Sequence, residues 1–105
     1  MFDRWSAQIQ HEDTTTTIAL RGEIDLVAAP DVRMAISDAL ADKARRLVID
    51  LSGTTFMDST GVQALVVAHQ TTRLLEIEFV VVPGPPLVMR TLELAGLHDL
   101  LTFDR

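Results

Sequence analysis

The sequence predicts a single α/β domain over residues 1–105, with a mixed, mostly parallel sheet of four to five strands. Short and nearly continuous apolar runs at residues 47–51 and 79–82 are typical of strands that are covered on both faces. Stretches with a helical apolar stripe alternate with these runs, which favours parallel strands joined by right-handed crossovers. The expected element order is strand, strand, helix, strand, helix, strand, helix. A chain of 105 residues, of which 48% are hydrophobic, can bury one core of this kind.

The chain begins with a predicted β-hairpin. Apolar and polar residues alternate over residues 5–10, which indicates a half-exposed strand. Residues 16–21 alternate in the same way, and Gly22 is expected to end this second strand. The four threonines at residues 14–17 are expected to supply β propensity on a partly wet strand rather than phosphorylation sites.

A first helix is predicted from about residue 28 to residue 41. Pro30 is acceptable in its first turn, because the N–H that proline lacks has no partner there in any case. A charged turn at residues 42–46 then leads into the buried strand at residues 47–51. The apolar stripe of the helix consists of Val32, Ala35, Ile36, Ala39 and Leu40.

The second helix is expected to begin near Ser59, after a connection at residues 52–57 that is rich in small hydroxyl residues. Asp58, Ser59 and Thr60 are all good N-cap types, because a side-chain oxygen there accepts a backbone N–H. Thr60 also has capping-box spacing to a glutamine three residues later, and Asp58 places negative charge at the positive end of the helix dipole. A well-capped helix without further function would show the same pattern.

The second helix is expected to reach about Leu75. His69 shares its apolar face with Val62, Leu65 and Val66, so we expect a packing residue rather than a catalytic base. A strand at residues 79–82, a proline-rich break at residues 83–86 and a helix at about residues 87–95 follow. Gly96 is a typical left-handed terminator of that helix, and residues 100–103 fit either a short strand or a helical turn.

The predicted topology gathers three loops at one edge of the sheet. They follow the carboxyl ends of the strands and comprise residues 22–25, 52–59 and 83–86. Sites in open α/β sheets form at this edge. Asp25 lies between two apolar neighbours in the first of these loops and is expected to point away from both.

Composition and charge exclude several classes of function. The net charge of −6 argues against a direct nucleic-acid partner, because such binding needs a basic surface. The apolar runs are too short for a membrane span or a signal peptide. The chain contains no cysteine and no exposed pair of metal ligands at helical spacing, so we expect neither a metal nor a cofactor.

The residues at this edge of the sheet do not match the motifs of three enzyme classes. A serine hydrolase would place Ser59 in a G-x-S-x-G elbow with a histidine nearby, but the context here is Asp-Ser-Thr-Gly. A small dimeric aspartic protease needs an unbroken Asp-Thr-Gly or Asp-Ser-Gly triplet, whereas an extra residue separates Asp58 from Gly61. A nucleotide-binding enzyme would carry a Walker lysine or a G-x-G-x-x-G loop, and the sequence has neither.

Three stretches of the chain resemble segments of one known family. Asp58-Ser59-Thr60-Gly61 after an apolar strand resembles the phosphoacceptor segment of the STAS domain, as in bacterial anti-sigma factor antagonists. Residues 22–25 resemble the family's Gly-Glu-Leu-Asp segment, and residues 90–97 resemble its last amphipathic helix with the glycine that ends it. The stretches occur in the family's order, and the resemblance covers residues 7–101. It implies a STAS-type fold.

The resemblance implies an interaction protein and not an enzyme. The family's unmodified form binds an anti-sigma factor, which is also a serine kinase of the histidine-kinase ATPase fold, and thereby frees a sigma factor. The kinase phosphorylates the serine that matches Ser59, which breaks the complex, and a PP2C-type phosphatase restores it. We therefore expect a cytoplasmic phosphoprotein of transcription regulation and stress response that works by partner switching. The expected partner-binding residues are Asp25, Asp58, Ser59, Thr60, Gly61 and Gly84.

The chemistry of Ser59 fits this role. A phosphate at a helix N-terminus is expected to meet free backbone N–H groups and the positive end of the dipole. It adds a charge of about −1.5 to −2 at neutral pH.

The chain departs from the family pattern in two places. It has Pro-Gly-Pro-Pro at residues 83–86, where Asn-Pro or Gly-Pro-Ser is common, so this loop is stiffer. Thr60 stands where a second serine is common and is a second candidate acceptor. Some family members are not phosphorylated and serve as subunits of transporter or sensor complexes, which is the alternative function. Weak nucleotide contact, known in the family, stays open as a side property.

Overall fold

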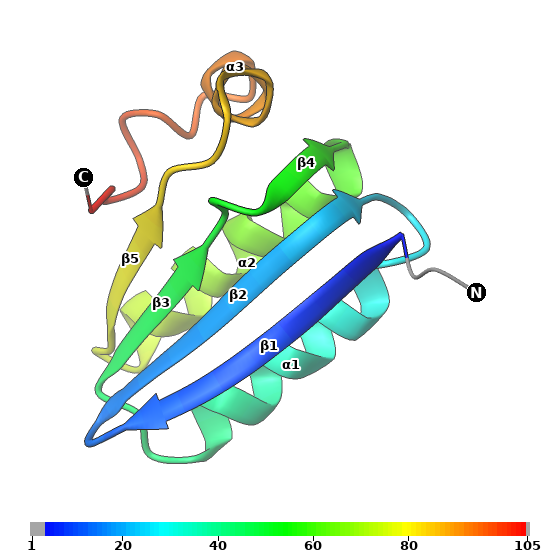
Figure 1. Ribbon diagram of the computed structural model, residues 1–105. Helices are drawn as coiled ribbons and strands as arrows, with labels where there is room; N and C mark the ends of the chain where they lie inside the picture. Colours follow the sequence, from blue (N-terminus) through cyan, green and yellow to red (C-terminus); the bar gives the residue numbers. More distant parts are fainter. Residues whose placement is uncertain (1–3, 105) are drawn as a thin grey trace.

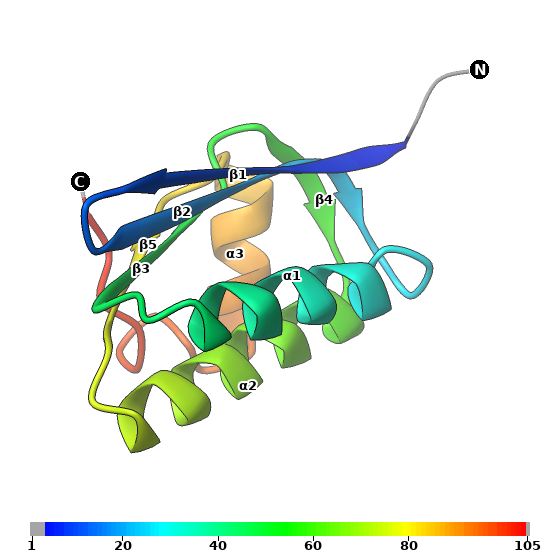
Figure 2. The same ribbon diagram turned by 90° about the horizontal axis from the view of Figure 1, so that it is seen from below.

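The computed structural model describes residues 4–104 and has a five-stranded sheet with two helices along one face. These helices, α1 (Ala29–Ala41) and α2 (Ser59–Leu74), lie side by side under the sheet, as Figures 1 and 2 show. The third helix, α3 (Pro86–Leu94), lies at the end of the sheet. The arrangement is that of an α/β layer structure, so the predicted fold class is confirmed.

One long strand, β2 (Thr15–Ile24), organises the sheet. β1 (Trp5–Glu12) pairs with it in the antiparallel direction, and β3 (Arg46–Asp50) pairs with its first half in the parallel direction. β5 (Glu78–Val82) extends the sheet beyond β3, again in the parallel direction. β4 (Thr54–Met57) pairs parallel with the last residues of β2. Parallel pairs therefore dominate, as the alternation of strands and helices predicts.

The prediction that Gly22 ends the second strand was wrong. β2 continues to Ile24, and its register shifts between Gly22 and Glu23. Gly22 has a φ of +84°, and a Cβ there would lie 2.1 Å from the carbonyl oxygen of Arg4, so only glycine fits this irregularity. The glycine signal marked a bulge within the strand and not its end.

β4 was not predicted, because residues 52–57 were interpreted as a connection. The turn after β3 places Gly53 so that its carbonyl oxygen accepts a hydrogen bond from the Gly22 N–H at 3.0 Å. The Thr54 hydroxyl, fully buried, then donates to the Leu20 carbonyl oxygen at 2.7 Å. Small hydroxyl residues thus attach β4 to β2 as its second parallel partner, and the element order gains one strand before α2.

One core lies between the sheet and the helices. Each inner strand contributes its alternate side chains, and the helices contribute the stripes that the sequence predicts. Gly96, with a φ of +81°, ends α3 as expected. The segment after it returns to the sheet, where Phe103 forms a short parallel bridge with Val81. The largest fully buried side chains include Ile18, Leu20, Ile24, Leu47, Ile49, Leu51, Leu65 and Leu92.

Candidate functional site

The N-terminus of α2 is capped by Asp58, which was one of three candidates. Its Oδ1 accepts hydrogen bonds from the backbone N–H groups of Thr60 at 2.9 Å and of Gly61 at 3.3 Å. Two donors that the helix itself leaves unpaired are thereby satisfied. The cap is therefore Asp58, and the capping box expected from Thr60 and Gln63 is not formed, because Thr60 already lies inside the helix.

Ser59 and Thr60 differ in what their hydroxyl groups do. The Thr60 hydroxyl donates a hydrogen bond to Asp58 Oδ1, and the Thr60 side chain is half-buried. Ser59 is exposed, and none of the side-chain hydrogen bonds found within residues 4–104 involves its hydroxyl. At this turn Ser59 therefore presents its hydroxyl to solvent, whereas Thr60 directs its own toward the cap.

The charge of the cap is stabilised by the same contacts. The hydrogen bond from the Thr60 hydroxyl lowers the pKa of Asp58, and partial burial opposes this shift. Backbone N–H groups, including that of Leu26 in the preceding loop, lower the pKa further. Asp58 is thus a carboxylate at neutral pH, and its contacts occupy N–H groups that we expected to be free for a phosphate on Ser59.

Gly61 has a packing reason to be glycine. A Cβ at this position would lie 2.7 Å from Met57 Cγ and 2.9 Å from the carbonyl oxygen of Ile24. The first turn of α2 therefore lies directly on the end of β2, and the Asp58 N–H donates to the same Ile24 oxygen at 3.3 Å. This close approach fixes the position of Ser59 relative to the sheet.

Asp25 orders the neighbouring loop between β2 and α1. Its Oδ1 accepts hydrogen bonds from the N–H groups of Val27 at 3.0 Å and of Ala28 at 3.3 Å, and its carbonyl oxygen accepts one from Ala29 at 2.9 Å. These bonds form an Asx-type turn that leads into α1. A small cavity joins the two loops, since Leu26 and Thr60 both line it.

Gly84 lies in a different part of the carboxyl edge. A Cβ there would lie 2.8 Å from the carbonyl oxygen of Leu51, the residue that follows β3, and 3.2 Å from Val88 on α3. The structure therefore brings Asp25 close to the turn that carries Ser59, and it surrounds Gly84 with other residues.

Exposed apolar residues near Ser59 were missed by the sequence analysis. Leu26 is 69% exposed and Val27 77% exposed on the loop that Asp25 orders, and Phe56 on β4 is 44% exposed. Leucine and valine in a hydrophobic chain do not signal exposure by themselves, because only the folded loop shows which face they occupy. Large apolar side chains gathered at one edge of a domain are typical of a docking surface.

The histidines make their contacts with residues outside this turn. His11 forms a hydrogen bond with Thr16 at 3.0 Å, and the ring of His98 stacks on that of Phe103. His69 is half-buried on α2. Within residues 4–104 no cluster of three or more metal-ligand side chains occurs, and no helix is long and apolar enough to cross a membrane.

Comparisons with known proteins identify the family and the fold. The family model for the STAS domain matches residues 6–105. An anti-sigma-B factor antagonist of Listeria monocytogenes is 33% identical over 97 residues, which cover 91% of this chain and 85% of that protein. The crystal structure of an anti-sigma factor antagonist from Mycobacterium paratuberculosis superposes with a TM-score of 0.87 at 31% identity, covering 94% of this chain and 84% of that one.

A more distant solved structure shares the fold. The Bacillus cell fate determinant SpoIIAA in its phosphorylated form has a TM-score of 0.75 at 20% identity, over 95% of this chain and 92% of its own. The family match spans nearly the whole chain, and a relative that is 33% identical covers 91% of it. The chain therefore belongs to the STAS domain family.

Proposed function

We propose that this domain is an anti-sigma factor antagonist and that phosphorylation of Ser59 switches its binding off. The observation that carries this proposal is the turn at the start of α2, where Ser59 is exposed between Asp58 and a Thr60 whose hydroxyl is already bonded. A kinase reaches an exposed hydroxyl on a well-ordered turn without unfolding the domain. The names of the relatives from Listeria and Mycobacterium support the antagonist role.

The partner in this proposal is an anti-sigma factor that is also a serine kinase of the histidine-kinase ATPase fold. The unmodified domain binds it and frees a sigma factor, and transfer of a phosphoryl group to Ser59 ends the complex. A PP2C-type phosphatase returns the domain to its binding form. Both partners come from the family resemblance, and the domain itself acts in the cytoplasm by binding and not by catalysis.

The docking surface in this proposal is the edge around Ser59. Leu26, Val27 and Phe56 supply exposed apolar contact area, and Leu26 lines a small cavity with Thr60, the neighbour of Ser59. Asp25 contributes by ordering the loop that carries Leu26 and Val27. Asp58, Thr60 and Gly61 shape the turn, and Gly84 contributes from the β3 side of the same edge.

A capture experiment with defined variants tests the proposal. Wild type, Ser59→Glu and Ser52→Glu are immobilised and incubated with lysate of the source organism, and bound proteins are identified by mass spectrometry. Ser52 is a matched control, because it is an exposed serine in a neighbouring turn. We expect a kinase-fold protein on wild type and on Ser52→Glu that is lost from Ser59→Glu. This protein, purified and supplied with ATP, should then phosphorylate Ser59 of the wild type.

Two outcomes would contradict the proposal. Stoichiometric phosphate on residues 14–17 or on Ser52, with none on Ser59, would place the switch elsewhere. Capture of transport or sensor subunits equally by wild type and Ser59→Glu would favour the alternative function, in which the domain is a non-phosphorylated subunit of such a complex.

A further inference from the structure

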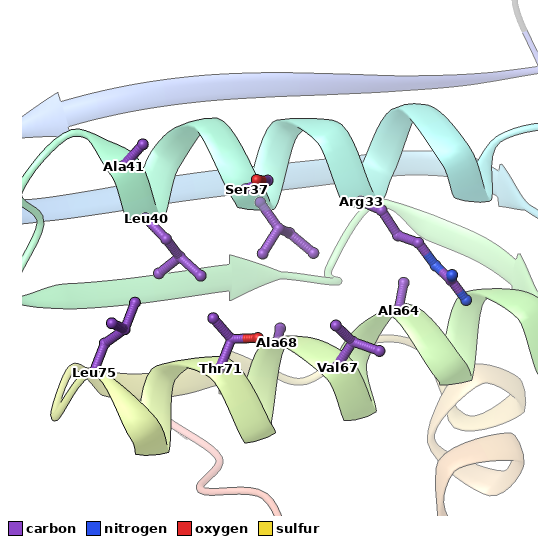
Figure 3. A pocket seen from close by; sticks show the side chains of 10 residues that line it. Arg33, Ser37, Leu40, Ala41, Ala64, Val67, Ala68, Thr71 and Leu75 are labelled. Atoms are coloured by element: carbon purple, nitrogen blue, oxygen red, sulfur yellow. The ribbon is translucent and has the colours of Figure 1, made fainter.

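An apolar groove of about 470 Å³ lies between α1 and α2. It begins at Arg33, which also lines the small cavity that contains Thr60, and it extends away from the turn of Ser59 along both helices. Side chains of the two helices point toward one another across it, as Figure 3 shows. Its polar groups are few, namely the guanidinium of Arg33 and the hydroxyl groups of Ser37 and Thr71. Mostly apolar walls with a few polar groups, enclosing about 300–1,000 Å³, are typical of sites for small molecules.

The shape of the groove suits a single hydrocarbon chain. Its lining on α2 includes the short side chains of Ala64 and Ala68, which leave space between the helices, and Leu40 and Leu75 stand at its far end. A helix is about 10–12 Å wide with its side chains and would lie over this groove without entering it. At a rise of about 1.5 Å per residue, the stretch of α1 that lines the groove, residues 33–41, is roughly 12 Å long.

One end of the groove is positive. Arg33 lies at that end, and Figure 3 shows its side chain extending from α1 toward α2 near Ala64. Neither of the ion pairs found within residues 4–104 involves Arg33. The two helices run in the same direction along the groove, so their N-terminal dipole ends also lie on the Arg33 side. A ligand that complements this charge distribution carries an anion at one end of an apolar body.

We propose that the groove binds the anion of a medium-chain fatty acid. The aliphatic chain lies between α1 and α2, and the carboxylate pairs with the guanidinium of Arg33, which presents a planar fork of donors to it. The proposal does not rest on phosphorylation of Ser59, because none of residues 58–61 lines the groove, although Arg33 also lines the small cavity that contains Thr60.

Titration with dodecanoate below its micelle concentration tests the proposal. Binding is measured by calorimetry and by amide shifts of ¹⁵N-labelled protein, with dodecanol as a ligand of equal chain length that lacks the charge. We expect saturable binding of dodecanoate at one site, with shifts confined to residues along the groove. Dodecanol should bind at least about tenfold more weakly, because its neutral hydroxyl cannot form the bidentate ion pair that a carboxylate forms with Arg33.

Two matched pairs of variants separate a specific site from general hydrophobic adsorption. Arg33→Gln should weaken dodecanoate binding about tenfold and leave dodecanol unaffected, whereas Arg73→Gln should change neither. Val67→Glu introduces a carboxylate into the groove and should abolish binding. Leu74→Glu is its control, because Leu74 is 84% exposed on the same helix and does not line the groove. Val67 is 38% exposed, so the substitution should not prevent folding.

Several results would overturn the proposal. Equal binding of dodecanol and dodecanoate, or equal effects of Val67→Glu and Leu74→Glu, would show non-specific adsorption. Self-association in sedimentation experiments that is lost in Val67→Glu would show that a second copy of the chain covers the groove. Binding to vesicles of anionic phospholipid without binding of free dodecanoate would identify a membrane surface as the ligand in place of a fatty acid.

Discussion

The Thr60 hydroxyl donates a hydrogen bond to Asp58 Oδ1, and Ser59, which lies between these two residues, is exposed. Asp58 thus uses one oxygen both to cap α2 and to accept the hydrogen bond of the Thr60 hydroxyl. The contacts that cap the helix therefore also leave Ser59 as the accessible hydroxyl for the proposed phosphorylation.

Asp58→Ala should destabilise the domain by about 1 kcal/mol at pH 7, because α2 loses its cap. The pKa of Asp58 is lowered from its ordinary value of 3.8 in the folded state. A group with a lowered folded pKa contributes stability that is present above its unfolded pKa and is lost as the pH falls through its folded pKa. The difference between wild type and Asp58→Ala should therefore shrink below about pH 4.

Urea unfolding of both proteins at pH 7 and at pH 3 measures this difference. Asp38→Ala is a suitable control, because Asp38 is exposed on α1 and takes part in none of the side-chain hydrogen bonds found within residues 4–104. An equal loss of stability at both pH values would contradict a role for the charge of Asp58.

Gly61→Ala should destabilise the domain by about 1–3 kcal/mol, because the new methyl group would overlap Met57 Cγ and the Ile24 carbonyl oxygen. Helix propensity alone predicts the opposite sign, since alanine is favoured over glycine by about 1 kcal/mol inside a helix. The backbone oxygen of Ile24 cannot yield without moving the end of β2, so the clash should dominate. Chemical denaturation with Gln63→Ala as the exposed control decides between the two effects, and a more stable Gly61→Ala would refute the close packing.

Thr54→Val tests the attachment of β4. The valine keeps the shape of the side chain but leaves the buried Leu20 carbonyl oxygen without the Thr54 hydroxyl, which donates to it at 2.7 Å. We expect a loss of about 1–3 kcal/mol in the free energy of unfolding. Thr55→Val, at the exposed neighbouring position, should change stability by less than about 0.5 kcal/mol. Equal effects of the two substitutions would mean that the hydrogen bond contributes nothing.

Much of the fold could be predicted from the sequence, because most elements carry a clear period. The buried runs that became β3 and β5 and the stripes of α1 and α2 were predicted within a few residues of their observed bounds. β4 was missed because its four residues, two of them threonines, are too short to show a period. Its strand character comes from pairing with β2, which is a tertiary property.

The candidate site was predictable in its chemistry but not in its geometry. Asp58, Ser59 and Thr60 were equivalent as caps in the sequence, and only the folded turn shows that Asp58 accepts the bonds. The exposure of Leu26 and Val27 could not be predicted, because apolar residues beside a helix start are more often buried. The proximity of Asp25 to the turn of Ser59 could be predicted from the topology, because the loops that carry them both follow the carboxyl ends of parallel strands.

Leu26→Ser should weaken binding of the anti-sigma factor about tenfold or more without lowering the melting temperature. Leu26 is 69% exposed next to the turn of Ser59, so its contacts are available to a partner and contribute little to the fold. Leu74→Ser is the matched control, because Leu74 is 84% exposed at the opposite end of α2. Calorimetric titration of both variants with the captured kinase measures the effect, and equal affinities would exclude the Leu26 loop from the interface.

Phosphate on Ser59 should act locally and leave the fold unchanged. It adds a charge of about −1.5 to −2 at the N-terminus of α2, where the helix dipole favours an anion by roughly 0.3–1 kcal/mol. The carboxylate of Asp58 lies beside it and already occupies the N–H groups of Thr60 and Gly61. Repulsion from Asp58 is screened at an exposed site, so this repulsion and the favourable interaction with the helix dipole are of similar size. We therefore expect the melting temperature to change by less than about 5 °C.

At the proposed interface with the anti-sigma factor, no favourable term offsets the charge of the phosphate. A surface that buries Ser59 would have to desolvate a phosphate without a matched cation, which costs several kcal/mol. Because about 1.4 kcal/mol corresponds to a factor of ten, affinity for the anti-sigma factor should fall by two orders of magnitude or more.

Protein that carries phosphoserine incorporated at position 59 allows the melting temperature and the affinity for the anti-sigma factor to be measured without depending on the kinase. Ser59→Glu should reproduce part of the loss, and Ser59→Ala should bind and resist release by ATP. A large melting shift with displaced backbone amides would indicate a conformational switch, and unchanged affinity would place Ser59 outside the interface.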